Sequence, residues 1–226
     1  MTAIIANSTA LNAVVTSSTA MAAVAASYVA VAAVYGSATA VEAVKANETA
    51  SATLAGATSA VMGKAVAVLA GLNPDSYADM AAVAASQTAM AAVASSQTAM
   101  AAVINSEAAR TALVSSSDAR KALKASSLAV EMSLVSSDGQ YWNSAGTKTM
   151  RGLILYTKAG NTDNAFTITK VDSTTLASNN NARNAATSGS TGYKDWLEAF
   201  PNSSWVLSSI TFYAYYRTTK IKYIPC

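Results

Sequence analysis

Residues 86–106 read SQTAMAAVASSQTAMAAVINS, a stretch in which one ten-residue unit occurs twice in succession. Related decapeptides follow one another over residues 8–47, beginning with STALNAVVTS and STAMAAVAAS. Self-similarity at a fixed period is the sequence signature of repeat architectures. The decapeptide therefore decides the fold of the first half of the chain.

Each decapeptide is led by Ser or Asn, residue types that cap helix N-termini because the side-chain oxygen accepts a hydrogen bond from the backbone. Ten residues of helix turn about 1000°, roughly 80° short of three turns, so the apolar stripe of one straight helix would rotate out of contact. The sequence instead predicts helices of about two turns that end at every Ser or Asn. The expected cap residues are Ser17, Ser27, Ser37, Asn47, Ser86, Ser96, Ser106, Ser116 and Ser126.

An apolar stripe accompanies the caps, and we interpret it as packing rather than as a ligand groove. Helices this short are unstable alone, so the repeats must stack on one another or on other copies of the chain. Alanine removes little apolar area from water, which favours other copies and predicts a homo-oligomer, most simply a homotrimer. The stripe consists of Leu11, Val14, Met21, Val24, Val31, Val34, Val41, Val44, Met80, Val83, Met90, Val93, Met100, Val103, Leu113 and Leu123.

The array is interrupted around residues 58–79. Ala57 stands where a cap is expected, residues 58–72 are compatible with one longer helix, and Asn73-Pro74-Asp75-Ser76 predicts a turn. The last decapeptides become more polar, as expected where a stacked array reaches solvent or meets another domain. The basic residues that enter there are Arg110, Arg120, Lys121 and Lys124.

The composition changes after residue 137. Of the 16 aromatic residues, 13 lie beyond residue 138, and apolar residues there alternate with a period of two, which is typical of β-strands. The chain is therefore predicted to be α+β, with a helical repeat shaft over residues 1–137 and a small β-rich domain over residues 138–226. Strands are expected at 151–158, 164–171, 208–216 and 220–224, with a hairpin turn at 160–163, a helix over 193–200 and a polar loop at 178–192.

One face of the strand expected at 208–216 is a candidate contact face. The alternation in SSITFYAYYR places Tyr213, Tyr215 and Arg217 on the side opposite Phe212. Tyr combines a large contact area with a polar tip, which suits recognition of a carbohydrate or a protein. The competing interpretation is that this face packs on a neighbouring chain.

Composition argues against several kinds of chemistry. There is no His and Cys226 is the only Cys, so neither an intrachain disulfide nor a Cys/His zinc site can form. We find no nucleophile motif, paired catalytic carboxylates or phosphate-binding loop, and expect no enzyme activity and no cofactor. The excess of basic residues is too sparse to predict nucleic-acid binding. Apolar stretches are shorter than a membrane span and no secretory signal is recognised, which predicts synthesis in a cytoplasm.

The decapeptides STAMAAVAAS (18–27), SQTAMAAVAS (86–95) and SQTAMAAVIN (96–105) resemble the S-x-T-A-M-x-A-V repeats of tail-fibre and other appendage proteins of tailed bacteriophages. The resemblance covers roughly residues 7–137, apart from the interruption. It implies a location in the virion and often a homotrimer, with one end docked on the particle and the other exposed. It supplies no catalytic residues.

These observations favour a structural virion component, such as a tail fibre, collar or head appendage, located in the virion. Its expected partners are other copies of itself, other virion proteins and a host surface glycan or protein bound by the C-terminal domain. A bacterial surface adhesin is the first alternative, although it would normally carry an export signal. An ice-binding protein would place Thr at eleven-residue spacing, whereas the spacing here is ten.

Overall fold

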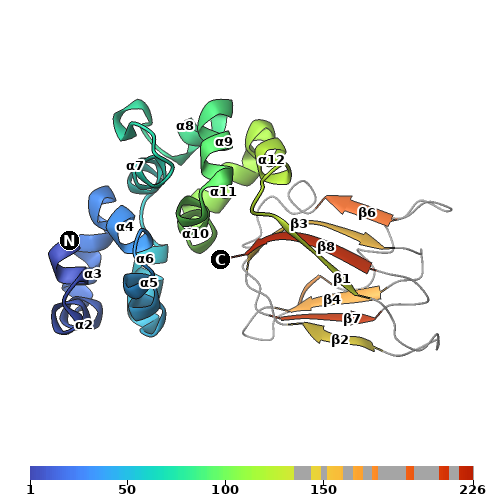
Figure 1. The fold of residues 1–226 in the computed structure, drawn as a ribbon, viewed down its shortest axis with the longest axis horizontal. Coiled ribbons are helices and arrows are strands. Elements are labelled where there is room, and N and C mark those ends of the chain that lie inside the picture. The colour runs from blue at the N-terminus through green and yellow to red at the C-terminus, as the bar shows by residue number, and fades with distance from the viewer. Residues whose placement is uncertain are drawn as a thin grey trace. The chain divides into compact units, whose positions relative to one another are not determined.

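The computed structural model describes the backbone of residues 1–134, 144–148, 152–159, 165–169, 175–177, 192–195, 209–213 and 219–225. Side chains are described over residues 1–132, 152–156 and 221–225. The chain divides into a helical unit, Met1–Leu128, and a strand unit, Ala129–Cys226. Because the helices lie in the first unit and the strands in the second, the fold class is α+β (Figure 1).

The helical unit is a succession of short helices. In chain order they are α1 (Thr2–Ile5), α2 (Ser8–Thr16), α3 (Ser18–Ala25), α4 (Tyr28–Tyr35), α5 (Ala38–Lys45), α6 (Glu48–Ala55), α7 (Ser59–Leu69), the 3₁₀ helix η1 (Pro74–Ser76), α8 (Met80–Ala85), α9 (Gln87–Ser95), α10 (Gln97–Asn105), α11 (Glu107–Ser115) and α12 (Ser117–Lys124).

An N-cap side chain opens every helix from α2 to α12. The Ser17 hydroxyl accepts a hydrogen bond from the backbone N–H of Ala20 at 3.2 Å, and the Asn47 side chain accepts one from Ala50 at 2.9 Å. Each cap satisfies an N–H group that a helix leaves unpaired, so the spacing of the caps sets the spacing of the breaks. The same bond to the third following residue forms at Asn7, Ser27, Ser37, Ser86, Ser96, Ser106 and Ser116.

Consecutive helices meet at sharp bends, 101° between α3 and α4 and 95° between α6 and α7. Three bends of this size nearly complete a circle, so a helix returns over the one three places earlier. Accordingly α5 packs on α2, α6 on α3 and α7 on α4. Later in the chain α10 packs on α7, α11 on α8 and α12 on α9. Three helices therefore make one turn of a coil, and the turns stack on each other (Figure 1).

The helices that begin at a decapeptide Ser or Asn, α2 to α6 and α9 to α12, each present two stripes to their neighbours. Counted from the cap, the third and seventh residues form the backward stripe, which packs on the preceding turn, and the fourth and eighth form the forward stripe, which packs on the following turn. The third-position alanines show the direction: Ala10 and Ala20 in the first turn are half-buried, whereas Ala40 and Ala50 in the second are 0% and 1% exposed. Alanine at this position lets stacked helices approach closely.

The predicted apolar stripe is buried at every position except Val14 and Val41, which are half-buried. Stacking three places apart fully buries large side chains such as Met90 and Leu123 inside the single chain, so burial of the stripe does not by itself require other copies. Self-association stays a prediction.

The stack is interrupted after α6. Thr58 caps α7 one position late, and α7 runs for 11 residues. The chain then turns at Gly71, whose φ of 73° is a left-handed value that favours glycine, and Asp79 caps α8. Within the described residues α8 and α9 make no contact with α5 and α6 comparable to the stacking elsewhere. The forward stripe of α5 and α6 is consequently left without a following turn.

The described residues of the strand unit form two antiparallel sheets. The order in the first sheet is β1 (Val130–Leu134), β8 (Thr219–Pro225), β3 (Gly152–Ala159) and β6 (Gly192–Asp195). The order in the second is β2 (Ser144–Lys148), β7 (Ser209–Tyr213), β4 (Ala165–Thr169) and β5 (Thr175–Ala177). Leu153, Ile154, Leu155, Ile221 and Ile224 are the buried apolar residues described in the first sheet.

The predicted strands correspond to β3, β4, β7 and β8, but two other predictions are wrong. Residues 160–163 do not join a hairpin, because β3 pairs with β6 and β8 whereas β4 pairs with β5 and β7. The helix expected over 193–200 is contradicted at its start by β6, in which Tyr193 pairs with Lys158. Pairing with a distant strand outweighs the local helical spacing of apolar residues. The rest of that segment and the 178–191 stretch lie outside the described residues.

The units divide at Leu128, earlier than the predicted boundary at 137. β1 begins at Val130 and pairs with β8, so residues 130–134 of the last decapeptide are strand rather than helix. Ser126 consequently caps no helix. Its hydroxyl accepts a hydrogen bond from the N–H of Leu128 and donates one to the carbonyl of Ala94. A cap residue type alone could not reveal that a long-range strand pairing competes for the residues after it.

Candidate functional site

The predicted contact face lies mostly outside the described residues. Tyr213 is the last residue of β7 and pairs with Ser144 of β2 and Ala165 of β4, so β7 is an internal strand of its sheet. Tyr215 and Arg217 are not among the described residues. The contact face therefore stays a prediction.

Cap serines have a second role that the sequence analysis missed. The Ser116 hydroxyl accepts a hydrogen bond from the N–H of Ala119 at 3.2 Å and donates one to the carbonyl of Ala84 at 2.7 Å. Ser96 makes the corresponding donation to Leu69 at 2.9 Å. The Ser96 hydroxyl joins the start of α10 to the end of α7, three places earlier, and the Ser116 hydroxyl joins the junction of α11 and α12 to the end of α8. They hold the turns together as well as opening the helices.

We expect Ser116→Ala to cost the helical unit about 2 kcal/mol, about 1 kcal/mol for the cap and a similar amount for the unsatisfied Ala84 carbonyl. Ser17→Ala is the matched control, because Ser17 caps α3 in the first described turn, and it should cost only about 1 kcal/mol. Urea unfolding followed by far-ultraviolet circular dichroism measures both. Equal losses in the two variants would show that the bond between turns contributes nothing.

Two arginines lie in the last turn of the stack. Arg110 and Arg120 occupy the fourth position of α11 and α12, on the forward stripe. A guanidinium N–H of Arg120 donates to the carbonyl of Val114 at 2.7 Å, and one of Arg110 donates to the carbonyl of Ile104. Both carbonyls lie near the end of the preceding helix, where backbone acceptors lack partners within the helix.

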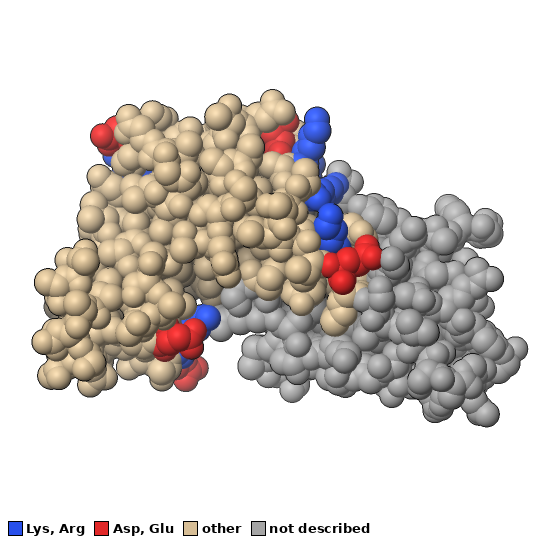
Figure 2. All heavy atoms as spheres, in the orientation of Figure 1, with Lys and Arg blue, Asp and Glu red and all other residues tan. Residues whose placement is uncertain are grey.

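The arginines make the hydrogen bond that a following turn would otherwise make. The carbonyls of Ile104 and Val114 occupy the same position in their decapeptides as that of Ala84, which accepts from Ser116 of the next turn. Figure 2 shows basic side chains gathered at this end of the helical unit, beside a surface that is largely uncharged. In α11 and α12, arginine at the fourth position thus accompanies the end of the stack.

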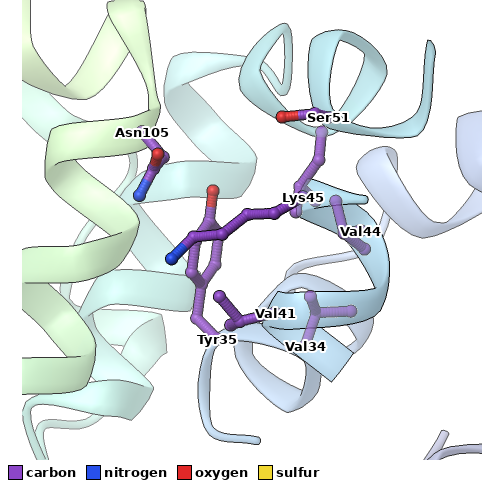
Figure 3. A pocket seen from close by; sticks show the side chains of 8 residues that line it. Val34, Tyr35, Val41, Val44, Lys45, Ser51 and Asn105 are labelled. Carbon is purple, nitrogen blue, oxygen red and sulfur yellow. The ribbon is translucent and has the colours of Figure 1, made fainter. Parts of the chain in front are cut away.

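A groove runs along the uncovered forward stripe of α5 and α6 (Figure 3). Its cavity of about 20 Å³ has room for little more than one water molecule, far below a small-molecule site of roughly 300 Å³. The floor is aliphatic, and the rim carries the Lys45 ammonium, which pairs with Glu42 at 3.3 Å. Figure 3 shows the lining side chains Val34, Tyr35, Val41, Val44, Lys45, Ser51 and, from α10, Asn105; Leu54 completes the groove.

A second groove lies between α9 and α12 and has a cavity of about 320 Å³, within the lower range of ligand sites. Its floor is alanine, and the Asp118 and Lys121 side chains on its rim belong to exposed residues. Exposed rim groups of this kind offer weak hydrogen bonds in competition with water. The lining is Gln87, Ala91, Ala94, Ser95, Asp118, Lys121, Ala122, Ala125, Ser126 and Ser127.

Carboxylates of the helical unit serve its structure. Asp79 caps α8, and Asp75 pairs with Lys64 at 3.1 Å. In the part of the chain that the structure describes, no three metal-ligating side chains gather. A membrane-spanning length and composition is reached there by no single helix, and only by the bent pairs α3–α4 and α6–α7 taken together.

Comparison with known proteins adds no relationship to these features. The sequence matches no protein-family model, and no curated protein matches it significantly.

Proposed function

We propose that this protein is a non-enzymatic structural component of a bacteriophage particle, such as a tail fibre, collar or head appendage. Residues 1–128 act as a decapeptide repeat array that spans distance. Residues 129–226 act as an attachment domain for a host surface molecule or a neighbouring virion protein. The chain works as a homo-oligomer, most simply a homotrimer.

The observation that carries the proposal is the division of the decapeptide side chains between contacts that stack the helices and an exposed face. The cap serines and both stripes hold one turn on the next, while outward positions such as Thr88, Ala91 and Gln97 are small or polar and exposed. Repeats stacked in this way hold the two ends of the array at a fixed separation. Residues such as Arg120 satisfy the backbone acceptors at the end of the stack. The resemblance of SQTAMAAVAS to phage appendage repeats supports the particle as its location.

Purified phage particles from a culture that produces this chain should contain it at a fixed stoichiometry. Mass spectrometry of the particles measures its presence, and gold-labelled antibodies against residues 129–226 should mark one class of appendage in electron micrographs. Label on the envelope of cells free of particles would support the adhesin alternative instead. Absence from both would overturn the proposal.

The attachment role has its own readout on the same particles. Tyr213→Ala combined with Tyr215→Ala should leave the chain on the particle but weaken adsorption to host cells or the binding of a neighbouring virion protein. Particles that carry the double variant in normal amount and adsorb normally would exclude this face as the attachment surface.

A further inference from the structure

The forward stripe of α5 and α6 is uncovered, yet it lacks the residues that end the stack elsewhere. Val41 and Ser51 occupy the fourth position of these helices, where Arg110 and Arg120 stand in the last turn. Val41, Ser51 and Ala55 are uncharged and half-buried. Lys45, the eighth residue of α5, is the charged member of the stripe, and its ammonium pairs with Glu42. Apart from Lys45, this stripe has, among the described residues, the composition of a covered surface without the helices that would cover it.

The complementary surface is also present and also uncovered. Of the four residues on the backward stripe of α2 and α3, Ala10, Val14 and Ala20 are half-buried, and Val24 is buried within the chain. In the turn above, the corresponding alanines of α5 and α6 are fully buried by stacking. No described helix packs on the backward stripe of α2 and α3 in the way that one turn packs on another.

We propose that α2 and α3 of a second copy of this chain stack on α5 and α6. The contact has a precedent inside the chain, where helices three places apart pack on one another in six pairs, α2 with α5 and α9 with α12 among them. The inference deepens the self-association included in the proposed function. It names the two surfaces that meet and makes the contact directional, from α2 and α3 of one copy to α5 and α6 of another.

The groove of Figure 3 fits a helical occupant better than a small ligand. The forward-stripe residues Val41 and Ser51 line it beside the seventh-position residues Val34, Val44 and Leu54, and its cavity is too small for more than water. The Lys45 side chain can lay its aliphatic stem along an incoming apolar helix while its ammonium stays at the rim. Alanines at positions 10 and 20 of the second copy would permit the same close approach that they permit within the chain.

The contact joins two different surfaces, so it is head-to-tail. A head-to-tail contact closes into a ring or continues as a filament, according to the rotation between copies. The homotrimer expected from the sequence is the smallest ring beyond a dimer. Arginine at the other end of the stack opposes extension there, which leaves α5 and α6 as the receiving surface.

Sedimentation velocity of the full chain over a wide range of concentration tests the contact. Ser51→Arg places the end-of-stack residue on α6, and Ala20→Arg places a charge on the opposing surface of α3. Each variant alone should be monomeric where the unchanged chain associates. Mixed in equal amounts, the two should form a complex of one copy each, because each retains the surface that the other lacks.

Ala23→Arg is the matched control, because Ala23 lies on α3 but is exposed. It should associate like the unchanged chain. Val41→Arg is a second change on the receiving surface, and far-ultraviolet circular dichroism shows that each variant is folded. A chain that stays monomeric at every concentration, folded variants that associate normally, or a mixture that remains monomeric would overturn the proposal. These outcomes are independent of whether the chain is found on virions.

Discussion

Gly63→Ala should destabilise the helical unit by about 3 kcal/mol, the upper end of typical overpacking costs. A Cβ atom at Gly63 would lie 2.3 Å from the carbonyl carbon of Asp79 and 2.6 Å from its oxygen. Separations this short require backbone movement, because the obstacle is main chain and not a flexible side-chain end. α7 and α8 approach each other at this point because residue 63 has no side chain.

The Asp79 backbone is poorly placed to yield. The Asp79 carboxylate caps α8 by accepting from Ala82 at 2.9 Å, and the Ser59 hydroxyl of α7 accepts from the N–H of Met80 at 3.3 Å. Moving Asp79 away from α7 would strain both bonds. The change therefore disturbs the junction that carries the chain from α7 into α8 and the last turn.

Gly56→Ala is the matched control for this prediction. Gly56 ends α6 with φ near −81°, and an added Cβ would meet its nearest atoms at 3.5 Å, an ordinary contact. We expect that variant to be unchanged or slightly stabilised, because alanine restricts the unfolded chain. Urea unfolding followed by circular dichroism compares the two. A Gly63→Ala variant as stable as Gly56→Ala would mean that α7 and α8 are farther apart than the structure places them.

The helix breaks could be predicted from the sequence because an N-cap is a local device. The acceptor at Ser17 and the donor at Ala20 are three residues apart, so residue type and spacing suffice. The direction of each bend could not be predicted in the same way. It depends on the backbone of the cap residue, as at Ser27 with φ −119° and ψ 114°, and on the packing of helices three places apart. The three-helix turn was therefore not predictable from the period alone.

For the candidate groove, too, the sequence predicts the local feature but not the packing between distant helices. The sequence located the interruption at residues 58–79, but the face that the interruption uncovers depends on where α8 lies in space. Val41 was predicted to pack on a neighbouring repeat, and it is half-buried because no following turn reaches it. In the strand unit, three strands that pair across long sequence separations, β1, β2 and β6, were missed. Local periodicity carries no information about such pairings.

Met90→Arg should cost the helical unit about 4 kcal/mol, or unfold it. Met90 is fully buried on the forward stripe of α9, where α12 covers it. Arginine occupies the same position at Arg120, where it is half-buried and donates to the carbonyl of Val114 at 2.7 Å. The equivalent acceptor for an arginine at position 90 is the carbonyl of Ala84, which already accepts from Ser116. The guanidinium would therefore be buried and would have to share that acceptor with Ser116.

The reverse change, Arg120→Met, is the control, because it exchanges the same two residue types at the uncovered end of the stack. It removes one hydrogen bond at a half-buried site and should cost about 1 kcal/mol or less. Met90→Leu should cost under about 1.5 kcal/mol, because it nearly conserves volume. All three Trp residues lie beyond residue 138, so circular dichroism reports mainly on the helices while tryptophan fluorescence reports on the strand unit of the same sample. Similar stabilities for Met90→Arg and Arg120→Met would contradict the assignment of α12 as the covering helix and of arginine as the residue that ends the stack.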